Sequence, residues 1–525
     1  MTIDSFRSTD LYATTATTSG SILYPGPVPP LQRQAPHYFG DLNLDQAVDS
    51  LLSRRDPYDL APFFHTRLTD PASVAYRHAV FTDLDTNRGL RPAIAVFAAA
   101  LNRVRKALAT AGKVRSEHEK HGWHLHAALN YVAAVQDLHR YLTEADLASA
   151  ALAQFRIALG EFVADERFTE LCDHAGNVAD QLYSLTYCLD IHGTRIRVSR
   201  FEGEKNYETD VRACFAKFEE TGTPRPTYDF HSRADLNHVE ARILDLVARL
   251  HPDQFTALAE FRDHHPRFLD ELITRFDREI QFYCAVAEFR DRLGRAGLAM
   301  CLPDILDTGK ELYAADLFDF ALADKLATGK HAVVCNDVDL RGPERAIVVT
   351  GPNQGGKTTF ARAIGQLYHL AALGVPVPAG QARIGLCDKL FTHFEREEDM
   401  STLSGKLEDD LRRVHDILTR ATADSVVVMN ESFTSTTVRD AALLGAAVLR
   451  RMLALDLRCV YVTFIDELSR LNAATVSMVA EVDPADPAVR TFRVTRRTAD
   501  GLAYAAALAE QHRLTYQQVK ERMVS

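Results

Sequence analysis

Cysteine is scarce in this sequence, and long apolar runs are missing from it. The 8 cysteines are scattered over 525 residues without a C-x-x-C pair, which favours reduced thiols packed as small core side chains over a disulfide framework or a zinc site. No apolar stretch is long enough to span a bilayer, and the N-terminal residues lack the basic and apolar regions of a secretory signal. These absences predict a cytoplasmic protein with no membrane partner.

The sequence also lacks a surplus of basic residues. Its formal net charge is −11, which argues against a protein coated in positive charge for non-specific nucleic-acid binding. A local basic groove stays open, because phosphate contacts need only a few well-placed lysines or arginines. Residues 102–120 are rich in both, and on a helix such side chains form either a DNA-facing stripe or simply the solvated face.

What is present is an ordinary globular composition, with 46% hydrophobic and 25% charged residues. The chain is too long for a single core, so we expect several domains. Residues 1–60 are predicted to form an N-terminal arm, partly irregular, because Thr, Ser, Pro and Gly crowd its first part. Residues 61–305 place apolar side chains at three- and four-residue spacing, which predicts a large all-helical region with a small non-helical insertion near 188–235.

Residues 306–525 differ from the helical region in the pattern of their apolar residues. They contain the short β-branched runs HAVVCNDVDL, RAIVVTG, SVVVMNE and CVYVTF, and helical stretches separate the later ones. Alternation of strands and helices is typical of a largely parallel sheet with helices on its faces. The sequence therefore predicts a multidomain protein in which an all-α region precedes an α/β domain.

The segment GPNQGGKT at 351–358 follows one of these strands and opens a predicted helix. It satisfies G-x-x-x-x-G-K-[ST] in the strand–loop–helix context of a P-loop. Its glycines let the backbone curl around phosphate oxygens, Lys357 places a charge on the β and γ phosphates, and Thr358 offers its hydroxyl to Mg²⁺. The motif predicts a site for ATP and Mg²⁺, and the alternative is a structural turn. The predicted nucleotide-binding residues are Gly351, Pro352, Asn353, Gln354, Gly355, Gly356, Lys357, Thr358 and Thr359.

A second polar element follows the apolar run SVVVM. Ligands sit at the carboxyl ends of strands in such sheets, and Glu431 emerges at that end. We predict that Glu431 is catalytic and orients and polarises the attacking water. Its neighbour Asn430 is predicted to act with Thr358 at the metal. Most P-loop ATPases have an Asp there, and an amide accepts a hydrogen bond from a metal-bound water but brings no charge.

Several segments resemble the ATPase domain of the MutS family of DNA mismatch-repair proteins. They are GPNQGGKTTFARAIGQ, LFTHFEREEDM, LEDDLRRVHDILTRATADSVVVMNESFTSTT and the C-terminal ADGLAYAAALAEQHRLTYQQVKERM. A weaker resemblance reaches back through TDPASVAYRHAVFTDL to CLPDIL, over text similar to the family's core and lever helices. The resemblance implies an all-α core and lever region followed by an ABC-type P-loop ATPase domain with C-terminal dimerisation helices.

The resemblance also assigns positions outside the P-loop. In this family a signature segment of one subunit completes the nucleotide site of its partner, and that position falls on Ser404 or Gly405. Phe464 stands at the switch position, where the family has a histidine. The family's mismatch-reading and connector domains are not matched, which points to a stand-alone MutS-like subgroup.

The function implied by the resemblance is that of a dimeric, DNA-binding ATPase. We expect a homodimer formed through the ATPase domain, which binds DNA in repair or recombination without the usual mismatch reading. Asn430 and Phe464 predict slow ATP hydrolysis, and they leave open a second hypothesis, a nucleotide-gated scaffold or binding module with little or no turnover. A third hypothesis is an ATPase that acts on branched or recombining DNA.

Overall fold

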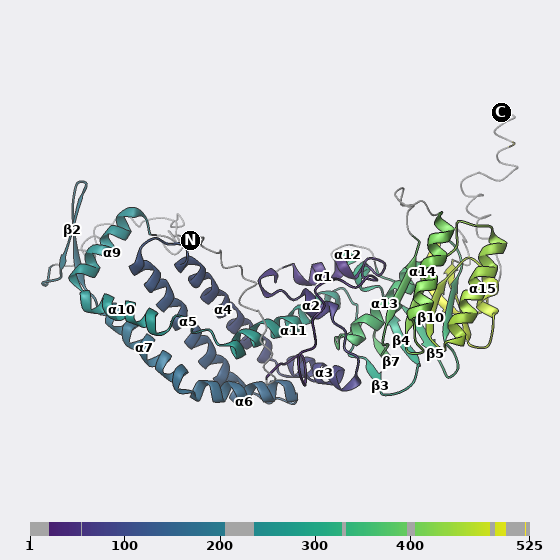
Figure 1. Ribbon diagram of the computed structural model, residues 1–525, viewed down its shortest axis with the longest axis horizontal. Helices are drawn as coiled ribbons and strands as arrows, with labels where there is room; N and C mark the ends of the chain where they lie inside the picture. Colours follow the sequence, from purple (N-terminus) through teal and green to yellow (C-terminus); the bar gives the residue numbers. More distant parts are fainter. Residues whose placement is uncertain are drawn as a thin grey trace, which may run out of the picture. The chain divides into compact units, whose positions relative to one another are not determined.

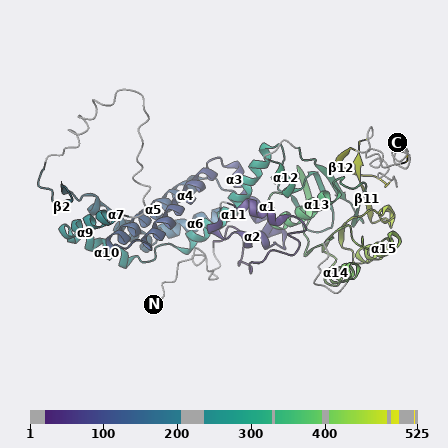
Figure 2. The ribbon, with the colours of Figure 1, turned by 90° about the horizontal axis from the view of Figure 1, so that it is seen from above.

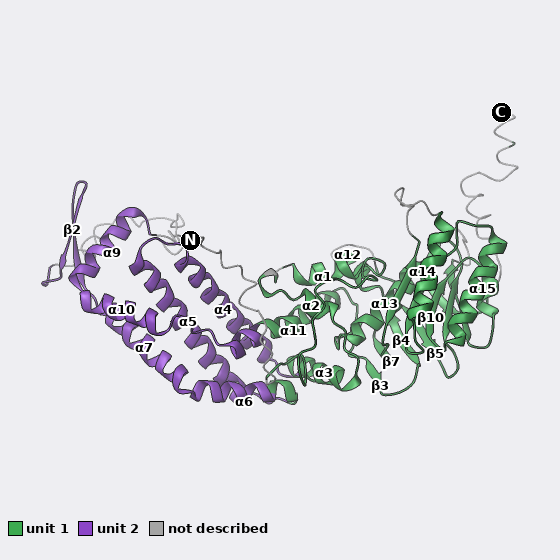
Figure 3. Cartoon of the chain, viewed as in Figure 1, with its two compact units in different colours: residues 1–85, 148–152, 278–525 green, residues 86–147, 153–277 purple. Residues whose placement is uncertain are grey.

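The computed structural model describes residues 20–53, 55–204, 236–327, 332–395, 405–483, 489–499 and 520, and Figure 1 labels its elements. Packing divides the chain into two compact units, coloured in Figure 3. Unit 1 comprises residues 1–85, 148–152 and 278–525, and unit 2 comprises residues 86–147 and 153–277. Within the described residues, no helix combines the length and the apolar character needed to cross a membrane.

The multidomain expectation is confirmed, with one helical unit and one unit that mixes helices and sheets. The compact units divide the chain at other positions than the predicted limits at 60/61 and 305/306. The predicted limits mark positions where the pattern of apolar residues changes along the sequence. The units group residues that pack together in space, so their limits need not coincide with the predicted ones. The predicted limits stay predictions.

Unit 2 is built mainly from long helices. Its elements are α4 (Leu90–Ala111), α5 (Glu117–Glu144), most of α6 (Ala150–Ala164), α7 (Glu166–Tyr183), α9 (His238–Leu250), α10 (Pro252–His264), the start of α11 (Glu271–Arg295) and the strands β1 (Tyr187–His192) and β2 (Arg195–Arg200). The strands form an antiparallel hairpin at the start of the predicted non-helical insertion. The rest of that insertion, residues 205–235, lies outside the described residues.

Two stacked aromatic rings lie in the core of unit 2. The rings of Phe155 and Phe276 have centroids 3.8 Å apart, and both side chains are buried. We expect Phe155→Ala to destabilise this unit by about 3–5 kcal/mol, because it removes buried apolar surface and leaves a cavity. Urea unfolding followed by circular dichroism measures the loss. The control Ile157→Ala removes an exposed side chain from the same helix and should leave the transition in place; equal shifts in both variants would contradict the prediction.

The described part of unit 1 begins with a segment that has no helix or strand but is packed into the fold. In residues 20–43, Ile22 and Leu23 are fully buried. The carboxylate of Glu279 accepts hydrogen bonds from the Ile22 amide at 2.7 Å and from the Ser21 hydroxyl at 3.0 Å. The Tyr283 hydroxyl donates to the Ile22 carbonyl at 2.6 Å. The segment is therefore anchored on α11 by hydrogen bonds that are buried.

Unit 1 contains further helices besides its part of α11. They are α1 (Leu44–Leu52), α2 (Ala61–His65), α3 (Pro71–Thr86, up to residue 85), α12 (Phe320–Leu326), α13 (Lys357–Ala372), α14 (Lys406–Arg420), α15 (Val438–Ala454) and the 3-10 helices η2 (Asp56–Tyr58) and η4 (Asp466–Arg470).

A six-stranded sheet forms the centre of the α/β part, in the order β12-β11-β6-β10-β9-β8. All neighbouring strands are parallel except β12, which is antiparallel to β11. The strands are β6 (Ala346–Thr350), β8 (Leu390–Phe394), β9 (Val426–Asn430), β10 (Arg458–Val462), β11 (Thr475–Val482) and β12 (Arg490–Arg496). The predicted β-branched runs RAIVVTG, SVVVMNE and CVYVTF become β6, β9 and β10, so the parallel sheet is confirmed.

The fourth predicted run, HAVVCNDVDL, belongs to a different sheet. Its last residues form β5 (Asn336–Leu340), which pairs antiparallel with β4 (Leu312–Leu317) in a four-stranded sheet completed by β3 (Asp304–Leu306) and β7 (Gln381–Gly385). Local sequence shows that a run favours a strand, but it does not show which distant strand will pair with it.

Helices cover both faces of the six-stranded sheet. Helices α14 and α15 share one apolar cluster with alternate strand residues, among them Val427 and Met429 of β9. Because successive strand residues point to opposite faces, the other residues of these strands are left for α13, which contacts β8, β9 and β10. Figure 2 shows α13 apart from α14 and α15. The parallel strands bring the carboxyl ends of β6 and β9 to the same edge of the sheet.

Candidate functional site

Residues 351–358, which run from the end of β6 into the first turn of α13, form a glycine-rich loop whose backbone requires glycine at its first position. Gly351 has φ +117°, and a Cβ there would meet the Ala480 carbonyl oxygen at 2.8 Å. Gly356, with φ +90°, precedes the first residue of α13, and the helix begins without a side-chain cap. Its first amides therefore have no capping side chain and point into the loop, which is the arrangement that binds anions at helix N-termini.

Lys357 is the first residue of α13 and is 4% exposed. Its Nζ donates to the carbonyl oxygens of Gly351 at 2.9 Å and Pro352 at 3.0 Å. Burial lowers the pKa of Lys357, the carboxylate of Glu431 opposes that shift, and Arg490 reinforces it. The loop thus holds an ammonium group beside a helix N-terminus that has no side-chain cap.

A hydrogen bond joins the glycine-rich loop to the end of β9. The hydroxyl of Thr358 donates to Oδ1 of Asn430 at 2.8 Å. Glu431 follows at once, with φ +52°, and its amide donates to the Val462 carbonyl at 3.0 Å. The structure therefore brings Lys357, Thr358, Asn430 and Glu431 together at one edge of the sheet.

The other predicted residues of the loop take different positions around this edge. Asn353 and Gln354 are exposed, Pro352 and Gly355 are buried, and Thr359 is half-buried in the first turn of α13. The loop position Gln354 has φ +61°, a conformation that a glycine would adopt at lower cost. The roles predicted for these residues stay predictions.

The predicted signature and switch positions are described only in part. Gly405 is exposed and extended at the N-terminus of α14, and Ser404 lies outside the described residues. Phe464 follows β10 and is 46% exposed. The predicted C-terminal dimerisation helices fall almost wholly on residues 500–519 and 521–525, which also lie outside the described residues.

Two residues beside the loop were not predicted from the sequence. Nε of Arg490 donates to the Asn353 carbonyl at 3.1 Å. Phe492, on the same strand β12, is 50% exposed, and its Cα lies 3.6 Å from where a Cβ on Gly356 would be. No local motif marks these positions, because they reach the loop only through the antiparallel pairing of β12 with β11.

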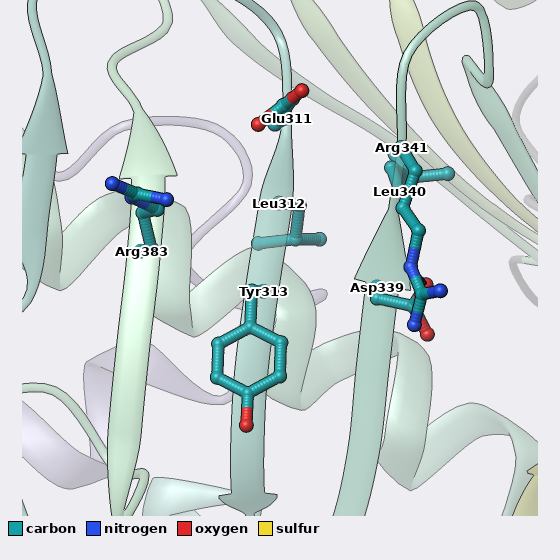
Figure 4. Close-up of a pocket in the computed structure, with 7 residues that line it drawn as sticks. All are labelled: Glu311, Leu312, Tyr313, Asp339, Leu340, Arg341 and Arg383. Atoms are coloured by element: carbon teal, nitrogen blue, oxygen red, sulfur yellow. Dashed lines mark ion pairs between the residues drawn. The ribbon is translucent and has the colours of Figure 1, made fainter.

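A pocket of about 330 Å³ lies on the four-stranded sheet, and none of the predicted residues lines it (Figure 4). Tyr313 on β4 lies between its cross-strand partners Arg383 and Asp339. Asp339 already pairs with Arg341 at 2.6 Å and with Arg496 at 2.7 Å. The charge of this pocket is thus partly neutralised by its own side chains, which makes it the weaker candidate site. Its lining residues are Glu311, Leu312, Tyr313, Asp339, Leu340, Arg341 and Arg383.

Comparison with known proteins places similarity over this same region. Residues 347–514 match the family model described as MutS domain V. The DNA mismatch repair protein MutS of Chlamydia trachomatis serovar D is 29% identical over 249 residues, covering 43% of this chain and 30% of that protein. The MutS proteins of Clostridium kluyveri and Synechococcus elongatus are 27% and 29% identical, each over 45% of this chain and 27% of the relative. The match thus spans less than a third of these relatives.

Proposed function

Because this chain is a MutS-family protein by its C-terminal part, we propose that it binds and hydrolyses ATP with Mg²⁺ as a dimeric, DNA-binding ATPase. In this proposal it acts in DNA repair or recombination without the usual mismatch reading. Domain V is the ATPase domain of the family. The observation that carries the proposal is the Thr358–Asn430 hydrogen bond of 2.8 Å, since it joins the glycine-rich loop to the strand end that carries Glu431.

The donors present at the loop fit the phosphates of a nucleotide. The uncapped amides of α13 and the buried ammonium of Lys357 supply hydrogen bonds and positive charge. A bound Mg²⁺ neutralises charge that develops on phosphate oxygens during transfer. Thr358 and Asn430 would hold that ion, and Glu431 would orient the attacking water and accept its proton.

The dimer and DNA assignments extend the same proposal. In the proposed dimer, the segment of Ser404 and Gly405 from one subunit faces the nucleotide of the other. Gly405 supports this assignment because it is exposed at the N-terminus of α14, where backbone amides favour an anion. The proposed DNA contacts belong to the helical region.

A nucleotide-gated scaffold with little turnover is the alternative function, and two observations favour it. Asn430 is neutral, and its amide oxygen is already engaged by Thr358. Phe464 is an exposed apolar side chain at the position where the family has a switch histidine, and it offers no polar atom to a phosphate.

Steady-state ATP hydrolysis by the full chain separates these functions. We propose measuring it alone and with homoduplex, mismatched and four-way DNA at fixed salt concentration, because phosphate contacts are salt-dependent. Turnover that responds to one DNA shape supports the DNA-coupled ATPase and identifies its substrate class. Tight nucleotide binding without turnover, and without a response to any DNA, would overturn it in favour of the scaffold.

We predict that Asn430→Asp raises turnover about fivefold and lowers the Mg²⁺ concentration needed for half-maximal turnover. The reason is that hydrogen bonds to a charged group are about 1 kcal/mol stronger than those to a neutral one. A Mg²⁺ titration of ATP hydrolysis measures both effects. The control Asn472→Asp adds the same charge before β11, at the opposite edge of the sheet, and should change neither. If Asn430→Asp fails to raise turnover, the low rate has another origin and the scaffold gains support.

A further inference from the structure

The turn that carries Glu431 has a backbone conformation that side chains other than glycine adopt only at a cost. Glu431 has φ +52° and Phe433 has φ +64°. Each left-handed non-glycine residue costs about 1 kcal/mol or more, and such strain persists only where the surrounding structure holds it. The contacts that hold this turn therefore also determine where the Glu431 carboxylate points.

The residue between the two strained positions is held by a buried histidine. Ser432 is 6% exposed, and its Oγ lies 2.8 Å from Nδ1 of His393 on β8. The ring of His393 is fully buried, and its Nε2 lies 3.3 Å from Oδ1 of Asp410 on α14, an ion-pair distance without the alignment of a hydrogen bond. His393 thus stands between the Glu431 turn and helix α14.

The charge of Asp410 indicates which nitrogen of His393 carries a proton. Burial raises the pKa of Asp410, but the His393 ring and Arg413 lower it more, so the pKa lies below the usual range and Asp410 is a carboxylate. A carboxylate only accepts hydrogen bonds, so the His393 nitrogen that faces it, Nε2, is the one that carries a proton. The hydrogen bond between Nδ1 and the Ser432 hydroxyl continues the chain from helix α14 to the turn.

A second contact joins the same three elements at the surface. Oε1 of Glu395, the residue after β8, accepts from the Thr434 hydroxyl at 2.9 Å and pairs with Lys406 of α14 at 2.5 Å. Thr434 belongs to the Glu431 turn, and Lys406 follows Gly405 directly. The turn is therefore tied to β8 and α14 both in the interior and at the surface.

A serine, a histidine and an aspartate linked in this order also occur in the catalytic triads of nucleophilic hydrolases. Burial argues against that use. With Ser432 6% exposed and His393 fully buried, a substrate carbonyl cannot reach the serine hydroxyl. The trio is suited to holding a backbone segment in place.

We propose that Ser432, His393 and Asp410 form a positioning network that holds the Glu431 carboxylate in its working orientation and makes that orientation depend on helix α14. This inference rests on the proposed ATPase function. None of the three residues touches the reacting atoms; they act through the backbone of the Glu431 turn. The network links the catalytic turn to the helix that begins beside the proposed partner-facing segment.

The test separates orientation from binding by comparing kcat with the Kd for nucleotide in the full chain. Ser432→Ala is expected to lower kcat about tenfold, since small misplacements of a catalytic group have large effects on rate, and to leave the Kd for a fluorescent ATP analogue within about twofold. The control Ser425→Ala removes another buried serine hydroxyl, at the far end of β9, which bonds Asp388 at 2.8 Å. It should leave kcat unchanged.

A pair of histidine variants tests the same network without touching the turn. The side-chain amide of asparagine lies where Nδ1 of histidine lies, so His393→Asn keeps a polar group that faces Ser432. The amide of glutamine lies where Nε2 lies, so His393→Gln keeps a polar group that faces Asp410. We expect His393→Asn to retain most of kcat and His393→Gln to lose as much as Ser432→Ala. If Ser432→Ala does not fold, this pair alone carries the test.

The outcomes distinguish this inference from the proposed function. If the wild-type chain hydrolyses ATP and Glu431→Gln does not, while Ser432→Ala and His393→Gln keep full kcat, the positioning network is wrong and the ATPase assignment stands. If kcat and Kd change in equal proportion, the trio serves only stability and the inference is also overturned. If the wild-type chain shows no turnover that depends on Glu431, the proposed function itself fails.

Discussion

Glu431→Gln is expected to lower kcat for ATP hydrolysis by about a hundredfold or more and to leave the Kd for ATP nearly unchanged. A positioned general base contributes about 10²–10⁴ in rate, and glutamine keeps the shape of the side chain while it loses the ability to accept the proton. The backbone of the site should persist, because the amide of residue 431 donates to the Val462 carbonyl whatever its side chain. Single-turnover hydrolysis and equilibrium binding of ATP measure the two quantities separately.

The matched control for this variant is Glu467→Gln. Glu467 is an exposed carboxylate in η4, so its replacement changes the net charge by the same amount and should leave kcat within twofold. Equal turnover by the wild-type chain and Glu431→Gln would show that the carboxylate after β9 has no part in hydrolysis. The scaffold hypothesis would then be the better account of the site.

Lys357→Ala is expected to weaken ATP binding by about 10- to 100-fold. A hydrogen bond from a charged donor contributes about 1.5–3 kcal/mol, and each 1.4 kcal/mol corresponds to a factor of ten in affinity. The side chain is 4% exposed and already lies against the loop carbonyls, so little rotamer entropy is lost when it binds a phosphate. Isothermal titration with ATP and with adenosine distinguishes the phosphate contribution from that of the base.

Lys325→Ala provides the control for this second variant, because Lys325 is an exposed lysine on α12 in the same unit. Its loss should not change either affinity. The expected pattern is a large effect of Lys357→Ala on ATP and a small effect on adenosine. If ATP binds Lys357→Ala as tightly as the wild-type chain, the glycine-rich loop is not the phosphate site.

Much of this arrangement could be predicted from local sequence, because its elements are encoded locally. The β-branched runs that become β6, β9 and β10 are buried on both faces, and such strands show as continuous apolar text. The loop follows from the spacing of Gly351, Gly356 and Lys357. Parallel strands share a carboxyl edge, so the proximity of the loop to Glu431 follows from the topology.

The parts that could not be predicted depend on pairings between distant residues. Arg490 and Phe492 reach the loop because β12 folds back on β11, and nothing in their immediate sequence marks that pairing. The sequence around His393 shows only a polar residue within an apolar strand. Its contacts with Asp410 and Ser432 are formed by residues distant in the sequence, so they could not be predicted. The position of Asn430 at the end of an apolar run is visible in the sequence, but its hydrogen bond to Thr358 depends on the fold.

The anchoring of residues 20–43 on α11 has a consequence for the order in which the chain folds during synthesis. Ile22 and its acceptor Glu279 are 257 residues apart, and a ribosome that adds about 5–20 residues per second needs roughly 13–50 s to make the second after the first. Throughout that interval the first-made segment lacks its partners on α11, while all of unit 2 is being produced. Unit 2 can therefore form its core during translation. Unit 1 can complete its core only after α11 has been made, because residues 20–43 pack on that helix.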